Sequence, residues 1–253
     1  MLQASELPGV IAAFDAARRR GEHFPRAFEN RLELDDAYRI LLGVASLRAR
    51  DGDARVGWKV GLTAAAIQQQ FGFHEPVFAC LFASGRIDSG HRFTHADLIR
   101  PGFENEVCFE LAEDVEPGAS LERIAVATRA IRPALEIIET RGDFTRDVAL
   151  AMADNGQQKA FVVGAAVPFR DLREVVARVR INGAEVASGS GAAVLGDPRE
   201  SLRWLAAKLA QFGERLRGGD YVMAGSFTRQ FPIAAGDRIE TEFVGIGTVG
   251  ASF

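Results

Sequence analysis

The segment RPGFENEVCFEL, residues 100–111, carries the clearest structural signal in the chain. Its apolar residues Val107, Phe109 and Leu111 alternate with other side chains, which is the two-residue period of a β-strand. Gly, Pro and Asp residues separate this run from its neighbours, as they commonly do between strands. We therefore predict a strand here and look for further strands on either side.

Runs of the same β-prone texture begin near residue 56 and continue to the end of the chain. They are VGWKVGL (56–62), PALEIIET (133–140), KAFVVGAAV (159–167), EVVARVRING (174–183), DYVMAG (220–225), DRIETEFV (237–244) and GTVGASF (247–253). Each is short and bounded by turn-forming residues, which indicates a strand-rich body.

Helical spacing of apolar residues dominates the N-terminal part instead. It predicts helices over residues 8–20 and 35–50, and the second has one face made of Ala37, Ile40, Leu41, Val44 and Leu47. Further helices are expected at about 63–70, 120–131 and 199–212, the last followed by Gly213 as a suitable C-cap.

These elements predict an α+β fold with a helical N-terminal region, residues 1–55, and a β-rich catalytic unit, residues 56–253. The strands do not alternate with regular helices, so a doubly wound Rossmann sheet is not expected. The GxGxxG spacing is absent, because GSGAAVLG (189–196) follows a different pattern. A rolled or barrel-like sheet fits the pattern better.

Composition excludes several functional classes. The net charge of -4 gives no basic footprint for nucleic acid, and no run of about 18 apolar residues suggests a membrane span. The N-terminus has its acidic residues before its basic cluster, the wrong order for a secretory signal. Cys80 and Cys108 match no metal or redox spacing, so we expect a cytoplasmic protein.

Three glutamates are candidates for metal chemistry. Glu104 and Glu106 are two apart in the predicted strand, so their carboxylates project from the same side and can offer two oxygen ligands to a hard cation. A solvated strand face is the alternative. Glu136 interrupts an apolar run, and a buried carboxylate there needs either a metal ion or an arginine partner.

Lysine is rare: the chain has 30 basic residues, of which only Lys59, Lys159 and Lys208 are lysines. Lys59 lies in an apolar segment bracketed by glycines, where burial brings a lysine pKa toward neutrality and allows acid–base chemistry. Its alternative is a side chain whose ammonium reaches water. Lys208 fits an ordinary amphipathic helix, and Lys159 fits either interpretation.

Two loops carry further polar groups. Asp154, Asn155 and Gly156 form a turn-like sequence. The segment GSFTR (225–229) offers hydroxyl and guanidinium groups that can bind a carboxylate or simply stabilise a loop. None of the four histidines falls in a zinc motif.

Taken together, the chain resembles the 2-keto-4-pentenoate hydratase and 4-oxalocrotonate decarboxylase group of the fumarylacetoacetate hydrolase superfamily. The resemblance runs in order over most of the chain, through GWKVGLT (57–63), RPGFENEVCFEL (100–111), PALEIIETR (133–141), ADNGQQKAFVVG (153–164), ING (181–183), SGSGAAVLGDP (188–198), WLAAKLAQFGERLRGGD (204–220), AGSFTR (224–229) and AGDRIETEFVGIGTVGASF (235–253).

The resemblance implies a β-roll catalytic domain and a Mg²⁺ or Mn²⁺ ion on Glu104, Glu106 and Glu136. The ion would bind a 2-oxo acid and polarise it. The residues that the resemblance places at the substrate are, as catalytic groups, Lys59, Glu75 and Asp154, and, as binding groups, Leu62, Ser226, Thr228 and Arg229. It also implies a homo-oligomer, or a complex with a related decarboxylase or hydratase, and a substrate from catabolism of an aromatic ring.

One departure from the family pattern bears on the reaction. The better-known hydratases carry an Asp where HEPVF (74–78) has Val77. Hydration would then need its proton from Glu75, His74 or another group. From the resemblance as a whole we expect a hydratase for a 2-hydroxy-2,4-dienoate or 2-oxo-4-enoate. The alternatives are a 2-oxo acid decarboxylase, an acylpyruvate C–C hydrolase, and a catalytically silent metal-binding partner subunit.

Overall fold

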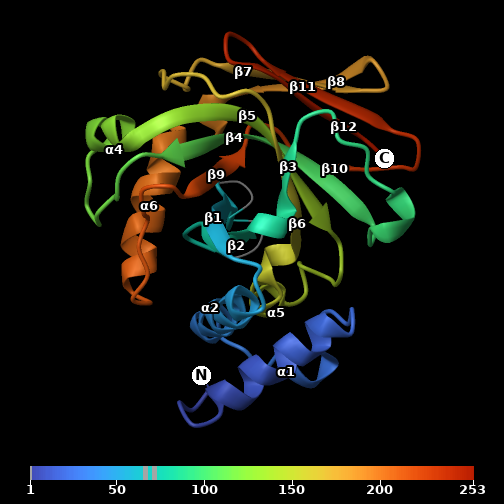
Figure 1. The fold of residues 1–253 in the computed structure, drawn as a ribbon, viewed down its shortest axis with the longest axis vertical. Coiled ribbons are helices and arrows are strands. Elements are labelled where there is room, and N and C mark those ends of the chain that lie inside the picture. The colour runs from blue at the N-terminus through green and yellow to red at the C-terminus, as the bar shows by residue number, and fades with distance from the viewer. Residues whose placement is uncertain (1, 65–67, 70–72) are drawn as a thin grey trace.

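The computed structural model describes residues 2–64, 68–69 and 73–253, and it combines α-helices with two β-sheets. Figure 1 shows the smaller sheet at the end of the molecule opposite the N-terminal helices, with the larger sheet between them. The described α-helices are α1 Leu7–Arg19, α2 Leu34–Arg50, α4 Leu121–Ala127, α5 Val148–Ala153 and α6 Pro198–Ala210.

The larger sheet has the strand order β2-β1-β9-β4-β5-β6-β3, and β10 pairs with β4. Its strands are β1 Arg55–Gly61, β2 Val77–Phe82, β3 Arg86–Asp88, β4 Pro101–Leu111, β5 Thr128–Glu139, β6 Gln158–Val163, β9 Tyr221–Ser226 and β10 Phe231–Pro232. The smaller sheet, in the order β12-β11-β7-β8, contains β7 Val176–Ile181, β8 Ala184–Ser190, β11 Arg238–Phe243 and β12 Gly247–Ser252.

The mixed α+β class is confirmed, and both sheets are open; the β-roll description stays a prediction. Each predicted strand segment contains a strand, whereas β2, β3, β8 and β10 were not predicted. Both faces of β2 are buried, so its sequence VFACLF lacks the alternation of a half-exposed strand. In the described residues no helix is long and apolar enough to cross a bilayer.

The helix predictions differ from the structure at two places. α4 ends at Ala127, whereas a helix to residue 131 was expected, because Thr128 and Ala130 pair with Leu111 and Glu110 across β4 and β5. α5 is only six residues long, too short for a periodic signal. The helix expected at about 63–70 includes residues 65–67 and 70, which lie outside the described ranges.

The helices over 35–50 and 199–212 are present. α2 begins with a capping box in which the Asp36 carboxylate accepts a hydrogen bond from Glu33 N, and it buries Ala37, Ile40 and Leu41. α6 is followed by Gly213 with φ 73°, the left-handed conformation that ends many helices.

The strand order β1-β9-β4-β5 determines where polar side chains meet. It brings together four segments that are far apart in sequence, at residues 55–61, 101–111, 128–139 and 221–226. In the β4–β5 register Glu104 lies directly opposite Glu136, and in the β4–β9 register Glu106 lies opposite Ser226.

Candidate metal centre and active site

Three carboxylates converge on the β4–β5 pair. Glu104 and Glu106 project from the same side of β4, and Glu136 faces them from β5. One oxygen from each side chain lies within 4.8 Å of the others. Glu106 and Glu136 are buried and Glu104 is partly buried, so the solvated-face alternative does not describe this cluster.

The cluster is electrostatically unfavourable without a cation. Burial, followed by repulsion from the neighbouring carboxylates, raises the pKa of Glu104 to about 7 and the pKa of Glu106 well above its ordinary value. Glu106 Oε2 accepts a hydrogen bond of 2.7 Å from Gly225 N, while its Oε1 has no hydrogen-bond partner among the residues that the structure describes. Three hard oxygen donors with excess negative charge and an unpartnered oxygen fit a divalent cation such as Mg²⁺ or Mn²⁺.

Lys59 lies beside this cluster, with its Nζ 3.2 Å from Glu136 Oε1. It also donates a hydrogen bond of 3.4 Å to the Gly156 carbonyl. Its exposed fraction is 7%, so the side chain does not reach for water, and the partner of Glu136 is this lysine rather than an arginine.

The charge state of Lys59 differs from the sequence expectation. Burial lowers its pKa, but attraction to Glu136, Glu104 and Glu106 raises it further, so the net shift is upward. The expectation of a pKa near neutrality is therefore wrong for the protein without a metal ion, in which Lys59 is an ammonium group.

The structure does not bring Glu75 into this cluster. Its Oε1 lies 2.8 Å from Lys208 Nζ and its Oε2 accepts a hydrogen bond of 3.2 Å from Trp204 Nε1, both on α6. Lys208 lies on α6, as its helical spacing predicted, and its side chain is buried beside Glu75. Lys159, the third lysine, also pairs with a glutamate, with its Nζ 3.4 Å from Glu139.

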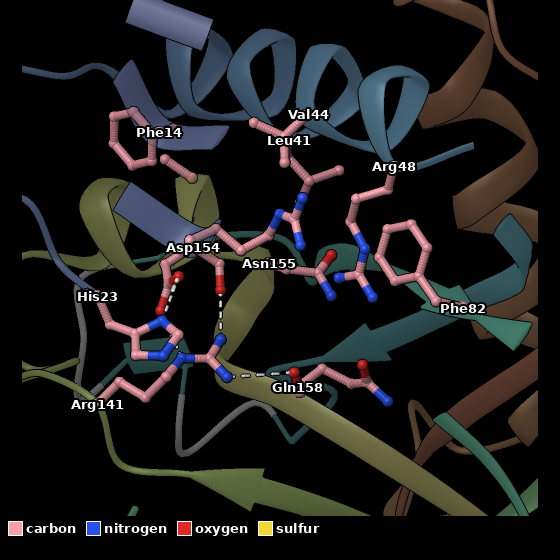
Figure 2. Close-up of a pocket in the computed structure, with 12 residues that line it drawn as sticks. Phe14, His23, Leu41, Val44, Arg48, Phe82, Arg141, Asp154, Asn155 and Gln158 are labelled. Atoms are coloured by element: carbon pink, nitrogen blue, oxygen red, sulfur yellow. Dashed lines mark hydrogen bonds and ion pairs between the residues drawn. The ribbon is translucent and has the colours of Figure 1, made fainter. Parts of the chain in front are cut away.

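Asp154 likewise has other partners. Its carboxylate accepts a hydrogen bond of 2.6 Å from Arg141 Nε and lies 3.4 Å from His23 Nδ1. Figure 2 shows these residues around a cavity of about 80 Å³ next to α1 and α2. This is a histidine–acid contact that sequence alone did not reveal, but the residues that line its cavity do not include the three glutamates.

The predicted binding residues divide between two places. Ser226 pairs with Glu106 across the β4–β9 ladder, and Leu62 directly follows β1 with φ 54°, a left-handed conformation. Thr228 Oγ1 instead accepts a hydrogen bond from the Asn105 side-chain amide. Asn105 points to the opposite side of β4 from Glu104 and Glu106. Arg229 is exposed and lies 4.0 Å above the Phe231 ring.

Two glycines complete the centre, although neither was assigned a role of its own from the sequence. Gly225 has φ 116°, and a Cβ there would lie 2.4 Å from Thr63 Oγ1, so only glycine allows its N–H to reach Glu106 beside Thr63. Gly156 supplies the carbonyl for Lys59. Backbone atoms make both contacts, so the side-chain types in the sequence give no sign of them.

The raised carboxylate pKa values predict how stability depends on pH. The unfolded chain releases the Glu104 proton near its ordinary pKa of 4.5, whereas the folded protein retains it to about 7. Metal-free protein should therefore lose stability as pH rises through this interval, because the folded state binds more protons. Thermal denaturation in EDTA tests this, and Glu104→Gln should flatten the profile. A metal-free profile that is unchanged by this substitution would argue against the raised pKa.

A protein-family model, described as fumarylacetoacetate (FAA) hydrolase C-terminal, matches residues 140–253. Among curated proteins, a 2-hydroxyhexa-2,4-dienoate hydratase from Comamonas testosteroni is 33% identical over 229 residues, which is 88% of this chain and 87% of the relative. A 4-oxalocrotonate decarboxylase from Pseudomonas sp. (strain CF600) is 33% identical over 86% of this chain and 84% of its own length.

Solved structures give a similar result. The 4-oxalocrotonate decarboxylase from Pseudomonas putida G7, complexed with magnesium and adipate, superposes with a TM-score of 0.92 at 28% identity and covers 100% of this chain and 99% of that chain. A fumarylpyruvate hydrolase from Pseudomonas aeruginosa, in complex with Mn²⁺ and pyruvate, has a TM-score of 0.60 at 17% identity, over 77% of this chain and 87% of that chain, and shows a shared fold.

Proposed function

This chain belongs to the family of 2-keto-4-pentenoate hydratases and 4-oxalocrotonate decarboxylases, and we propose that it is a metal-dependent hydratase of a 2-hydroxy-2,4-dienoate. Relatives of the chain are enzymes named for such substrates. The observation that carries the proposal is the meeting of three carboxylates beside a buried lysine. A substrate from the catabolism of an aromatic ring fits both the names of the relatives and this arrangement of residues.

The residues of the centre divide the chemistry between them. Glu104, Glu106 and Glu136 would bind Mg²⁺ or Mn²⁺, which supplies Lewis-acid polarisation of a 2-oxo acid. The Lys59 ammonium, fixed between Glu136 and Gly156, would supply a proton to the carbon chain of the substrate and stabilise negative charge that develops on its 2-oxygen. Water would then add to the remaining carbon–carbon double bond.

Ser226 and Leu62 are the proposed substrate-binding residues nearest to these groups. Ser226 lies across from Glu106, and its hydroxyl donates to the Asn105 carbonyl at 3.2 Å. Thr228 and Arg229 lie further along the same loop, where Arg229 would meet a second carboxylate only on a long substrate. Catalytic roles for Glu75 and Asp154 stay predictions, because both carboxylates already have partners.

Decarboxylation is the second candidate, and Val77 favours it. Val77 is buried opposite Gly61 in the β1–β2 register, so the strand next to Lys59 is apolar where the better-known hydratases carry an Asp. Loss of carbon dioxide from a 2-oxo-3-enedioate breaks a carbon–carbon bond and leaves its electron pair in an enolate, which needs a proton but no added water. The high structural similarity to a decarboxylase is consistent with this reaction.

Product analysis separates the two reactions. Purified protein with Mg²⁺ would be mixed with 2-hydroxypenta-2,4-dienoate or with 4-oxalocrotonate, and the loss of ultraviolet absorbance, carbon dioxide release and product mass would be followed. A product heavier by one water identifies a hydratase, and one lighter by one carbon dioxide identifies a decarboxylase. Cleavage of an acylpyruvate would identify a hydrolase. Metal binding without turnover of any of these would contradict an enzymatic role and indicate a partner subunit.

The remaining expectations are part of this proposal. We propose a homo-oligomer acting in the cytoplasm, or a complex with a related decarboxylase or hydratase. We propose that the chain divides into a helical region at residues 1–55 and a catalytic unit at residues 56–253. Size-exclusion chromatography with light scattering tests the oligomeric state.

A further inference from the structure

We propose that Arg141 is a positioning residue for Lys59, acting through the turn at residues 154–157. This inference rests on the proposed function, because it assigns Lys59 the proton-transfer role. Figure 2 shows the Arg141 guanidinium beside Asp154, which begins this turn, and Gln158, which directly follows it. The turn carries the carbonyl that accepts from Lys59.

The turn has a conformation that its own residues do not favour. Asn155, Gly156 and Gln157 have φ values of 57°, 57° and 61°, all in the left-handed region. Glycine tolerates this region and asparagine visits it, but glutamine rarely does. Three such residues in succession require support from outside the turn.

Arg141 supplies that support from both ends of the turn. Its Nε donates to Asp154 Oδ2 at 2.6 Å, its Nη2 to the Asp154 carbonyl at 2.7 Å, and its Nη1 to the Gln158 carbonyl at 3.3 Å. Its backbone N–H donates to Gln157 Oε1 at 3.0 Å. The planar guanidinium provides several donors in a fixed geometry, which a lysine ammonium would not reproduce.

The opposite side of the turn is attached to the sheet. The Asn155 amide accepts from Cys80 N at 2.9 Å and donates to the Cys80 carbonyl at 3.0 Å. Cys80 belongs to β2, which pairs with the β1 strand that carries Lys59. The turn is therefore fixed to β2 by Asn155 and to the end of β5 by Arg141.

These contacts bring Gly156 directly against Lys59. Lys59 Nζ donates to the Gly156 carbonyl at 3.4 Å, and a Cβ added to Gly156 would lie 3.1 Å from Lys59 Cε. The lysine is thus confined between Gly156 and Glu136. A displacement of the turn would remove one of the two oxygen partners that fix the ammonium group.

β5 positions both oxygen partners of Lys59, Glu136 directly and the Gly156 carbonyl through Arg141. β5 carries Glu136, which pairs with Lys59, and it also carries Glu139, whose Oε2 lies 3.2 Å from Arg141 Nη1. Arg141 lies two residues beyond the end of β5 and has a side chain that is 6% exposed. In this arrangement Asp154 is the counter-ion of Arg141 rather than a group that touches substrate.

The rarity of lysine allows a direct test. Protein labelled with ¹⁵N at lysine Nζ contains three such groups, and Lys159→Arg and Lys208→Arg assign the signal of Lys59. The test variants are Arg141→Gln and Asp154→Asn. The matched control is Arg48→Gln, since Arg48 lines the same cavity but pairs with Asp53.

We expect the Lys59 signal to shift in both test variants and to stay in place in the control. Turnover of the dienoate or 2-oxo acid should fall by about 10- to 100-fold in Arg141→Gln and less in Asp154→Asn, with KM and Mg²⁺ affinity nearly unchanged, because misplacement of a catalytic group acts on the chemical step.

An unchanged Lys59 signal and unchanged kcat in folded variants, with only a lower Tm, would overturn the proposal. If Arg141→Gln does not fold, Asp154→Asn decides alone, because it keeps the size of the side chain. If the wild type turns over no substrate while the Lys59 signal still responds to Asp154→Asn and not to Arg48→Gln, the placement of Lys59 by the turn stands and the proposed function fails.

Discussion

Glu106→Gln should weaken Mg²⁺ binding by at least about 100-fold and reduce turnover accordingly. Loss of a residue that only hydrogen-bonds a metal ligand already lowers metal affinity by up to about 100-fold, and Glu106 is itself a proposed ligand. The same substitution should raise the Tm of the metal-free protein. Glu106 is fully buried next to two other carboxylates, so folding without a metal ion must either bury its charge or protonate it. A neutral amide of the same shape removes that cost. Calorimetric titration and thermal denaturation, with EDTA and with Mg²⁺, measure both effects.

The opposite signs of the two effects make this prediction specific. Loss of an ordinary stabilising residue would lower the Tm with and without metal. Glu110→Gln is the matched control, since Glu110 lies on the same side of β4 but is paired with Arg129 and Arg132. Wild-type Mg²⁺ affinity in Glu106→Gln, or equal losses of affinity in the two variants, would show that Glu106 is not a metal ligand.

Lys59→Arg should reduce kcat by about 10²- to 10⁴-fold, the usual contribution of a positioned proton donor. Arginine retains the positive charge beside Glu136, so Mg²⁺ affinity should change little. Its guanidinium is larger and does not release a proton at ordinary pH. It must also fit against Gly156, which closely contacts the Lys59 side chain. Steady-state kinetics at saturating Mg²⁺ provides the measurement.

Lys159→Arg is the control for this experiment. Lys159 also pairs with a β5 glutamate, but its side chain is 43% exposed and Glu139 lies outside the carboxylate cluster. We expect wild-type kinetics for this variant. If Lys59→Arg also had wild-type kinetics, Lys59 would be a structural residue that only balances the charge of the three glutamates.

Much of the site was predictable because alternate residues of a strand point to the same side of the sheet. Glu104 and Glu106 are two residues apart, so a strand had to place them on one side. The apolar surroundings of Glu136 indicated a buried carboxylate that needed a partner. What the pattern did not supply was the β4–β5 register, which places Glu104 opposite Glu136 and is determined by the whole sheet.

The contacts that the sequence did not reveal have physical causes of the same kind. Glu75 and Asp154 are ordinary polar residues by type, and only the fold shows that α6 and Arg141 already engage their carboxylates. Lys208 lies at a regular helical position, and its burial depends on a contact with a residue 133 positions away. Such long-range pairs leave no periodic signal in the sequence.

The most direct test of the account is a crystal structure of the protein with Mg²⁺ and oxalate, which stands in for the 2-oxo acid group of a substrate. We predict one ion bound at about 2.1 Å to an oxygen of each of Glu104, Glu106 and Glu136, with oxalate on its open positions and Lys59 Nζ beside the oxalate. An ion bound elsewhere, or oxalate bound without contact to these carboxylates, would contradict the account.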